Sequence, residues 1–287
     1  MTSSRTIAIT GANSGIGLRA TAKLAREGHT VLALCRDTER ARATIDQATG
    51  GAPQVHVIHA DLSRLTSVED AAAAVASHGP LDALINNAAV FDLGQKAVTL
   101  TDEGHELFWA TNHLGPFALT ARLSSLLARA PQPRIVFIAS KGLMTMPWLR
   151  IRFDELSSGS WYSPTQAYYH SKLAQVMTAV SLAERVPASV GVTCIRVPAV
   201  KLDKARLATQ PPLLRALYAP KNAAAAEPES LAATYVRAAT QPAPSTDVYI
   251  DENDRAVAIP RTARDAAARD RLWSLSDKAT GEVDWAW

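Results

Sequence analysis

Residues 6–17 read Thr-Ile-Ala-Ile-Thr-Gly-Ala-Asn-Ser-Gly-Ile-Gly. The first five are mostly apolar and β-branched, as in a buried strand, and a helical pattern begins near residue 16. Gly11, Gly15 and Gly17 would let the backbone turn sharply and approach a pyrophosphate, which the N–H groups and the positive dipole end of the helix would bind. Any tight turn can contain glycines, but a strand before it and a helix after it are the context that dinucleotide binding requires. The stretch therefore predicts a dinucleotide site at the first turn of an α/β fold.

The same alternation of short apolar runs and helical patterns continues along the chain. Strict strand–helix alternation predicts a doubly wound parallel sheet of seven strands, a Rossmann fold with helices on both faces. No change in composition and no low-complexity linker divides the chain, so we expect a single domain over residues 1–287. The expected strands span 6–10, 30–35, 55–60, 81–86, 134–139, 191–197 and 247–250, and the expected helices span 16–27, 38–48, 64–77, 102–130, 162–185 and 228–240.

Two segments interrupt this alternation. Residues 143–163 contain Pro147, Trp148 and Trp161 without a clear period, and residues 199–221 are rich in leucine and proline. Long irregular segments in compact domains are usually binding loops, although a plain insertion is the alternative. Both follow expected strands and so lie at the carboxyl edge of the sheet, where ligands bind in such folds. We therefore expect both segments to be substrate loops.

The composition is that of an ordinary globular protein. Of 287 residues, 47% are hydrophobic and 20% are charged, and the net charge is +3 with basic residues interspersed among acids. This pattern does not indicate nucleic-acid binding. No run approaches 18 apolar residues, so no integral membrane segment is expected, and no charged-then-apolar leader is visible. The sequence predicts a cytoplasmic protein.

The cysteines and histidines do not form a metal-binding pattern. Cys35 and Cys194 both lie in apolar strand-like runs, which predicts buried free thiols. His56 and His59 are three residues apart on an expected strand and so point to opposite faces. No Cys/His cluster has zinc spacing, and the Gly-x-Ser-x-Gly turn of hydrolases is absent. Neither a metal site nor a serine-hydrolase nucleophile is predicted.

The end of the second expected strand bears on the choice of cofactor. A carboxylate there would bind a ribose 2′-hydroxyl, whereas an arginine accommodates a 2′-phosphate. Cys35 stands where the acid would be and Arg36 follows it, which favours NADPH over NADH. The alternative is that Arg36 is a solvated residue at the start of a helix, with Asp37 neutralising it.

Tyr168 and Lys172 are one helical turn apart in the expected helix 162–185. At this spacing the two Cβ atoms lie about 5–6 Å apart on one face. An ammonium beside a phenol favours the phenolate and lowers its pKa from about 10, which makes the tyrosine a usable acid or base near neutral pH. Many surface helices carry such a pair by chance, so the rest of the chain must decide its meaning.

Together these features resemble the short-chain dehydrogenase/reductase superfamily, over nearly the whole chain. Asp61 and Leu62 are similar to the family's adenine contact, and residues 86–89, Asn-Asn-Ala-Ala, are similar to its Asn-Asn-Ala-Gly turn. Further stretches resemble the retinol-dehydrogenase-like branch, namely residues 35–37, 61–63, 101–106, 112–117 and 272–276. The glycine turn and the resemblance together imply cofactor contacts at Gly11, Asn13, Ser14, Gly15, Ile16, Gly17, Arg36, Asp61, Leu62, Asn87, Ala88, Ala89, Tyr168, Lys172, Pro198 and Val200.

The resemblance also implies four catalytic residues. Tyr168 would be the general acid in carbonyl reduction, and Ser140, after the strand 134–139, would hold the substrate oxygen. Lys172 would lower the tyrosine pKa and bind the nicotinamide ribose, while Asn112 would position a water that feeds protons to the lysine. Among their neighbours, Tyr169 is expected to line the pocket or pack, Lys141 to be solvated, and Thr10 and Thr111 to be structural.

The chain departs from the family pattern in two places. Ala89 replaces a glycine, which would cost about 1 kcal/mol if that position requires positive φ. After the sixth strand the family usually has Pro-Gly and a nearby threonine that grips the nicotinamide carboxamide, whereas residues 197–202 read Val-Pro-Ala-Val-Lys-Leu. Backbone groups of Val200 would have to serve instead.

We therefore expect an NADPH-dependent oxidoreductase that reduces a carbonyl on a lipophilic small molecule. The alternative is a redox-neutral or non-redox enzyme of the same family, such as an epimerase or a cyclase, or else an imine-directed reductase. A nucleotide-sensing protein without turnover would be expected to lack one of the four catalytic residues, and none is missing. The resemblance makes a homodimer through helices 102–130 and 162–185 plausible. Trp285 and Trp287 are expected in a frayed tail, or else docked on a neighbouring subunit or over the substrate cleft.

Overall fold

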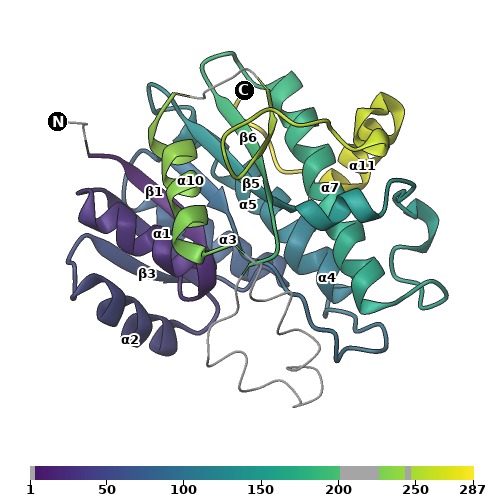
Figure 1. The fold of residues 1–287 in the computed structure, drawn as a ribbon, viewed down its shortest axis with the longest axis horizontal. Coiled ribbons are helices and arrows are strands. Elements are labelled where there is room, and N and C mark those ends of the chain that lie inside the picture. Colours follow the sequence, from purple (N-terminus) through teal and green to yellow (C-terminus); the bar gives the residue numbers. More distant parts are fainter. Residues whose placement is uncertain (1–3, 201–225, 243–246) are drawn as a thin grey trace.

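The computed structural model describes residues 4–200, 226–242 and 247–287. They contain a seven-stranded sheet in which all neighbouring strands are parallel, in the order β3-β2-β1-β4-β5-β6-β7 (Figure 1). The direction of winding reverses between β1 and β4, so the expected doubly wound Rossmann fold is confirmed. The strands are β1 (Thr6–Thr10), β2 (Thr30–Cys35), β3 (Val55–His59), β4 (Ala83–Asn86), β5 (Arg134–Ser140), β6 (Gly191–Val197) and β7 (Tyr249–Asp251).

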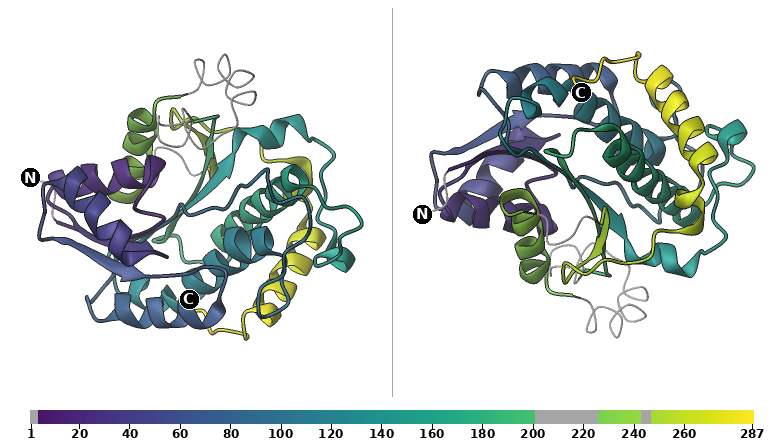
Figure 2. Two further views of the ribbon diagram at one scale, coloured as in Figure 1. Left: turned by 90° about the horizontal axis from the view of Figure 1, so that it is seen from below. Right: turned by 90° about the horizontal axis from the view of Figure 1, so that it is seen from above.

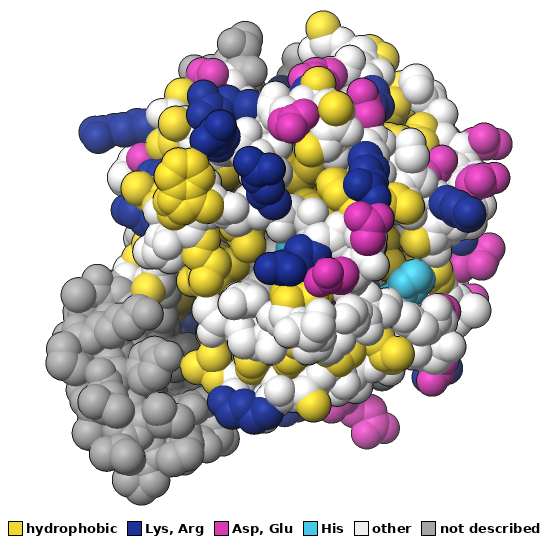
Figure 3. Space-filling view, turned by 90° about the vertical axis from the view of Figure 1, so that its right-hand side faces the viewer, with side chains coloured by type: hydrophobic (Ala, Val, Ile, Leu, Met, Phe, Trp, Pro, Cys, Tyr) yellow, Lys and Arg dark blue, Asp and Glu magenta, His cyan; other side chains and the backbone are white. Residues whose placement is uncertain are grey.

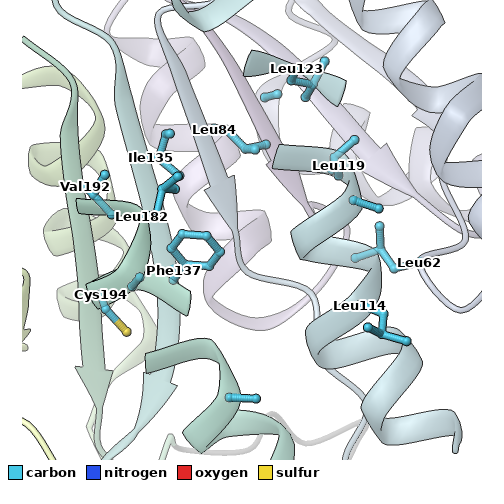
Figure 4. Close-up of a cluster of buried hydrophobic side chains, with 14 of the residues drawn as sticks. Leu62, Leu84, Leu114, Leu119, Leu123, Ile135, Phe137, Leu182, Val192 and Cys194 are labelled. Carbon is cyan, nitrogen blue, oxygen red and sulfur yellow. The ribbon is translucent and has the colours of Figure 1, made fainter. Parts of the chain in front are cut away.

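Helices cover both faces of this sheet (Figure 1, Figure 2). They are α1 (Gly15–Arg26), α2 (Thr38–Thr49), α3 (Leu65–Ala76), α4 (Leu107–Trp109), α5 (Gly115–Arg122), α6 (Ser124–Leu127), α7 (Pro164–Arg185), α10 (Pro228–Thr240) and α11 (Ala266–Ala279), with 3₁₀ turns η2 (Lys141–Thr145), η3 (Phe153–Glu155) and η4 (Arg261–Arg264). Alternate strand residues point to opposite faces, so Ile7 and Ile9 share a core with α1, α2 and α10, whereas Ala8 shares one with α3, α5, α7 and α11. Figure 4 shows part of this second core, with Leu84 and Leu119 among its members.

Helices α2 and α7 begin where the sequence provides caps. Ser163 caps α7 by accepting a hydrogen bond from the Gln166 N–H at 3.2 Å, and a proline follows at the first helical position, where no N–H partner is needed. Asp37 caps α2 by accepting from the Arg40 N–H at 3.0 Å, and Gly50 ends that helix with a φ of 69°. These local signals explain why the expected bounds of both helices agree with the structure to within two residues.

The helix expected over 102–130 is broken, which corrects the prediction. Helix α4 begins five residues later than expected, after Glu106, whose carboxylate accepts from two backbone N–H groups at 3.0 and 2.8 Å. A π-helical turn, Ala110–Leu114, then separates α4 from α5. Pro116 explains this turn, because it has no N–H to donate to the Asn112 carbonyl in the α-helical pattern.

Helix α11 was not among the expected helices. It buries Arg269, Leu272 and Ser276, of which two are polar, so the apolar stripe that periodicity detects is very weak. Arg269 is buried because it donates two hydrogen bonds to the Glu184 carboxylate of α7, at 2.6 and 2.8 Å. This helix is therefore held by contacts with α7 rather than by a pattern of its own.

The C-terminal tail packs on the chain's own core, so the positions expected for it are wrong. The Trp285 ring centroid lies 5.3 Å from that of Phe117 on α5 and 4.9 Å from that of Trp273 on α11. The Ala286 N–H donates to the Ser124 hydroxyl oxygen at 3.0 Å. The tail thus covers Phe117, on one of the helices through which a dimer was expected.

Three further expectations concern the cysteines, the charges and the membrane. Cys35 and Cys194 are both buried free thiols, as predicted. On the face shown in Figure 3, basic and acidic side chains are interspersed, in keeping with the scattered charges of the sequence. Within the described ranges, the helices are all too short or too polar to cross a membrane.

Candidate active site

A cleft of about 820 Å³ opens along the carboxyl edge of the sheet. Its walls come from the carboxyl ends of β1, β2, β5 and β6, from the segments that follow β1 to β4 and β6, and from α7 and α10. Volumes of several hundred Å³ are typical of small-molecule and cofactor sites. All the residues expected to contact the cofactor line this cleft except Gly17, and Ser140 lines it as well. The fold therefore gathers residues from distant parts of the chain at one edge of the sheet.

The glycine turn is shaped to bring backbone close to a ligand. Gly11 and Gly15 have φ values of 66° and 54°, in the left-handed region that favours glycine. A Cβ on Gly17 would lie 2.3 Å from the Gly11 carbonyl oxygen, so a larger residue does not fit there. Helix α1 has no acidic residue in its first turn, so the positive end of its dipole meets the cleft without a carboxylate in that turn. These features fit the pyrophosphate of a dinucleotide.

Side chains beside this turn join the ends of β1 and β4. The buried Thr10 hydroxyl oxygen accepts from the N–H groups of Asn87 and Ala88 at 3.0 and 2.9 Å. The Asn87 amide donates in turn to the carbonyls of Thr10 and Gly11 at 2.8 and 3.3 Å. Thr10 is therefore structural, as expected. Ala89 is not among the described residues with positive φ, so the strain considered for this position does not arise.

The end of β2 presents two arginines to the cleft. Cys35 is buried at the strand tip, while Arg36 is exposed and lines the cleft. Arg40 lines it too and was not predicted, although its spacing of four residues from Arg36 across a helix start is a signal that could have found it. The Asp37 carboxylate accepts from the Arg40 backbone N–H and so serves as the N-cap of α2.

Tyr168 of α7 and Ser140 at the end of β5 both line the cleft, and the Ser140 side chain lowers the pKa of the Tyr168 phenol. The Ser140 Oγ accepts from the Gly142 N–H at 3.2 Å, which orients the hydroxyl. Burial, with a smaller contribution from Tyr169, raises the pKa of Tyr168 to about 12, against the lowering effect of Ser140. Tyr168 is therefore a neutral phenol at physiological pH.

Lys172 is buried, and its ammonium is directed to neutral acceptors. The Nζ donates to the Ile138 carbonyl and to the Gln175 Oε1, both at 2.8 Å, and lies 5.9 Å from the centre of the Tyr168 ring. Burial lowers the pKa of Lys172 to about 8, partly offset by Cys194. The net pKa of Tyr168 is raised rather than lowered, because desolvation of the phenol outweighs the effect of an ammonium that points to other acceptors.

Gln175 is a site residue that sequence reasoning missed. It is buried on α7, three residues after Lys172, and its amide oxygen accepts from the ammonium without cancelling the positive charge. A polar residue at the i+3 position from a candidate catalytic lysine is the signal that could have found it, because side chains at this spacing meet on a helix. Gln175 therefore helps to set where the Lys172 ammonium points.

Asn112 lies in the π-helical turn and does not line the cleft. Its side chain accepts from the Val90 N–H at 2.7 Å and donates to the Val90 carbonyl and the Ser171 hydroxyl, both at 3.0 Å. The Ser171 hydroxyl donates in turn to the Tyr168 carbonyl at 2.7 Å. The Asn112 side chain therefore joins the segment after β4 to the helix that carries Tyr168 by hydrogen bonds.

Three aromatic rings stand in a row along this edge. The ring centroids of Phe91 and Tyr168 are 4.5 Å apart, and those of Tyr168 and Tyr169 are 5.3 Å apart. Tyr169 packs over Gly142, where an added Cβ would lie 2.0 Å from the tyrosine hydroxyl oxygen. Of the two roles expected for Tyr169, the structure shows packing.

Of the two expected substrate loops, the structure describes all of residues 143–163 and, of residues 199–221, only 199 and 200. In residues 143–163, the large apolar side chains of Met144 and Trp148 are exposed. Residues 201–221 of the second loop lie outside the described residues, whereas Val200 lines the cleft.

Lys141 and Thr111 are neighbours of the proposed catalytic residues. Lys141 was expected to be solvated, and it is exposed, with its Nζ 3.4 Å from the Glu252 carboxylate. Thr111 was expected to be structural, and it lines the cleft with a buried hydroxyl that has no hydrogen-bond partner among the described residues. Among the residues that the structure describes, no group of three or more His, Cys, Asp or Glu side chains could hold a metal ion.

Known proteins resemble this chain in sequence and in fold. Residues 5–150 match the family model for short chain dehydrogenases. The chain is 34% identical over 285 residues to human dehydrogenase/reductase SDR family member 13, a match that covers 96% of the chain and 73% of that protein. It is 37% identical over 195 residues to mouse retinol dehydrogenase 14, over 63% of the chain and 57% of that protein, so this match spans little more than half of the relative's length. A solved structure of an uncharacterized protein from Mycobacterium paratuberculosis matches with a TM-score of 0.70 at 30% identity, over 99% of this chain and 95% of that one.

A doubly wound parallel sheet with a glycine turn, a tyrosine and a lysine at its carboxyl edge defines a nucleotide-dependent oxidoreductase of the Rossmann type. The chain belongs to the short-chain dehydrogenase/reductase superfamily, in its retinol-dehydrogenase-like branch. As a member of this family it is an oxidoreductase that binds NAD or NADP and acts at an alcohol or carbonyl group.

Proposed function

We propose that the protein is an NADPH-dependent reductase of a carbonyl group on a lipophilic small molecule. The observation that carries this proposal is the meeting of Tyr168, Ser140 and Lys172 in the cleft that begins at the glycine turn. NADPH bound in this cleft would supply the hydride. The protein's own groups supply the proton and orient the substrate.

Tyr168 is the proton donor in this proposal. Because burial raises its pKa to about 12, the phenol carries its proton at physiological pH, which is the state that reduction needs. The phenol donates to the substrate oxygen as that oxygen gains negative charge. Ser140, which lines the cleft with Tyr168 and is oriented by the Gly142 N–H, holds the same oxygen.

Lys172 supplies positive charge beside the proton donor. With a pKa of about 8 it is mostly protonated at neutral pH, and an ammonium nearby favours the phenolate as the proton leaves. The Ile138 carbonyl and Gln175 take two of its three N–H donors, and we assign the third to the nicotinamide ribose. Pro116 has no N–H to donate to the backbone carbonyl of Asn112. We assign this carbonyl to the binding of a water that returns protons to Lys172.

The choice of NADPH rests on Arg36 and Arg40, which both line the cleft at the end of β2. Two guanidinium groups there suit a 2′-phosphate, and the nearby Asp37 carboxylate is engaged as the cap of α2. The choice of a lipophilic substrate rests on the large apolar side chains left exposed after β4 and β5, which are those of Phe91, Met144 and Trp148.

Replacing Arg36 with alanine should weaken NADPH binding by about 10- to 100-fold, or about 1.4–2.7 kcal/mol, because a hydrogen-bonded charge partner of the 2′-phosphate is lost. NADH has no 2′-phosphate, so its affinity should change by less than about threefold. Fluorescence titration with each cofactor measures both effects. Arg42→Ala is the matched control, since Arg42 is exposed on α2 and does not line the cleft. Equal losses of NADPH and NADH affinity would remove Arg36 as the phosphate partner.

The reaction itself is tested by a paired assay. The enzyme is incubated with NADPH and a panel of hydrophobic ketones and aldehydes, and NADPH absorbance is followed together with product by mass spectrometry. We expect one NADPH to be oxidised for each alcohol that forms. Product that accumulates without oxidation of NADPH would contradict a reductase and would indicate a redox-neutral enzyme such as an epimerase or a cyclase.

A further inference from the structure

Phe91 is an exposed ring that contacts the proposed proton donor. Half of its surface, 50%, is accessible, and its ring centroid lies 4.5 Å from that of Tyr168 with 44° between the planes. Single exposed apolar side chains are common on proteins and need no explanation. This one differs because one side of the ring is seated on Tyr168 while the rest is open.

The position of Phe91 is set by the frame of the active site. Asn112 is buried and binds both the N–H and the carbonyl of Val90, the residue just before Phe91, at 2.7 and 3.0 Å. Asn112 also donates to the Ser171 hydroxyl, which donates to the Tyr168 carbonyl. Phe91 and Tyr168 are therefore joined twice, through their rings and through this chain of hydrogen bonds. A ring held in this way is preorganised for binding.

Phe91 stands outside the cleft assigned to the cofactor. Val90 and Tyr168 both line that cleft, whereas Phe91 does not. The ring therefore extends an apolar surface from Tyr168 away from the dinucleotide. In the proposed complex the substrate's carbonyl oxygen meets the Tyr168 and Ser140 hydroxyls, and a substituent that lies on the Phe91 side of the Tyr168 ring would contact this surface.

We propose that Phe91 is a specificity-determining residue, whose ring stacks on a planar aromatic or conjugated group attached to the carbonyl that Tyr168 protonates. Rings pair favourably at centroid distances of about 4.5–7 Å, and such a pair adds about 0.5–1.5 kcal/mol to the burial of apolar area. The enzyme then prefers an aryl ketone over its saturated analogue of the same carbon skeleton. This inference rests on the proposed function, because it assigns the substrate's carbonyl to Tyr168.

The test compares 2-acetylnaphthalene with its fully saturated analogue, 2-acetyldecalin, on the wild type and on Phe91→Leu. Leucine keeps an apolar side chain but removes the ring. For the naphthyl ketone we expect Phe91→Leu to lower kcat/KM by about 5- to 10-fold, mainly through KM, as the loss of one ring pair implies. For the decalin ketone the change should stay below about twofold. Phe91→Tyr, which retains a ring, should keep the preference, and Leu100→Ala, which alters another exposed apolar residue, should leave both values unchanged.

Equilibrium binding of both ketones, measured by saturation-transfer NMR in the presence of NADP, gives a readout that does not need turnover. Equal losses for the two ketones in Phe91→Leu, in binding and in kcat/KM, would overturn the inference and leave Phe91 as a support for Tyr168. If the wild type binds the naphthyl ketone in a Phe91-dependent way but reduces neither ketone, the proposed reductase function fails, and Phe91 is left as a residue that binds an aryl group without a role in carbonyl reduction. Thermal unfolding of each variant shows that the half-exposed position tolerates the change, with a shift below about 3 °C expected.

Discussion

Replacing Tyr168 with phenylalanine should lower kcat for carbonyl reduction by about 10³-fold or more, because general acid catalysis by a positioned group contributes about 10²–10⁴-fold. The variant keeps the ring that contacts Phe91 and loses the hydroxyl that is the proposed proton donor. The dissociation constant of NADPH should change by less than about threefold, since the glycine turn and Arg36 are proposed to carry most of the cofactor contacts. Single-turnover kinetics with saturating NADPH measure the chemical step directly.

Tyr169→Phe is the matched control for this result. Tyr169 is the adjacent tyrosine on the same helix, and it packs over Gly142. Its loss of a hydroxyl should change kcat by less than about fivefold. If Tyr168→Phe retained more than a tenth of wild-type kcat, the proton would have to come from another group, and the role assigned to Tyr168 would be wrong.

Replacing Gly17 with alanine should weaken NADPH binding by about 100-fold or more, equivalent to at least about 2.7 kcal/mol. The added Cβ would lie 2.3 Å from the Gly11 carbonyl oxygen and 2.6 Å from the Asn87 amide nitrogen. A backbone oxygen cannot move away alone, so the whole turn must shift. That shift displaces the N–H groups of α1 that are expected to bind the pyrophosphate. Titration of NADPH by fluorescence measures the loss.

Gly159→Ala controls for the methyl group itself, because its Cβ would meet Val98 at an ordinary 3.8 Å. We expect NADPH affinity within about twofold of wild type for this variant. The melting temperature of Gly17→Ala without cofactor shows whether the turn alone or the whole fold has changed. An unchanged dissociation constant in a folded Gly17→Ala protein would contradict the assignment of the pyrophosphate to this turn.

Much of the fold could be predicted because its signals are local. Most strands are short apolar runs buried on both faces, and capping residues such as Asp37 and Ser163 mark where helices begin. The break in helix 102–130 was harder to predict because a proline and a buried glutamate act through backbone hydrogen bonds. Helix α11 escaped prediction because two of the three residues that it buries are polar, Arg269 paired with Glu184 of α7 and Ser276 with His113 of the π-helical turn.

The candidate site also has features that are visible in the sequence and features that depend on the fold. Glycines at fixed spacing and a Tyr–Lys pair one turn apart are visible in the chain, and the cleft contains all of these except Gly17, which shapes the turn beside it. Arg40 and Gln175 were missed because one lies a helical turn beyond the expected contact and the other looks like an ordinary buried polar residue. The two hydrogen bonds between the Asn112 side chain and the Val90 backbone could not be predicted, because they join two segments that meet only after folding.

Local sequence is enough to assign the turn at residues 11–17, the order of strands and helices, and the residue types available for catalysis, since backbone conformation and periodicity depend on near neighbours. The protonation and the contacts of those residues depend on packing. Burial keeps Tyr168 protonated, and packing places the Lys172 ammonium beside the Ile138 carbonyl and Gln175 and the Phe91 ring against that of Tyr168. Desolvation and ring contact are set by whatever surrounds a group in three dimensions, and groups far away in the chain supply those surroundings.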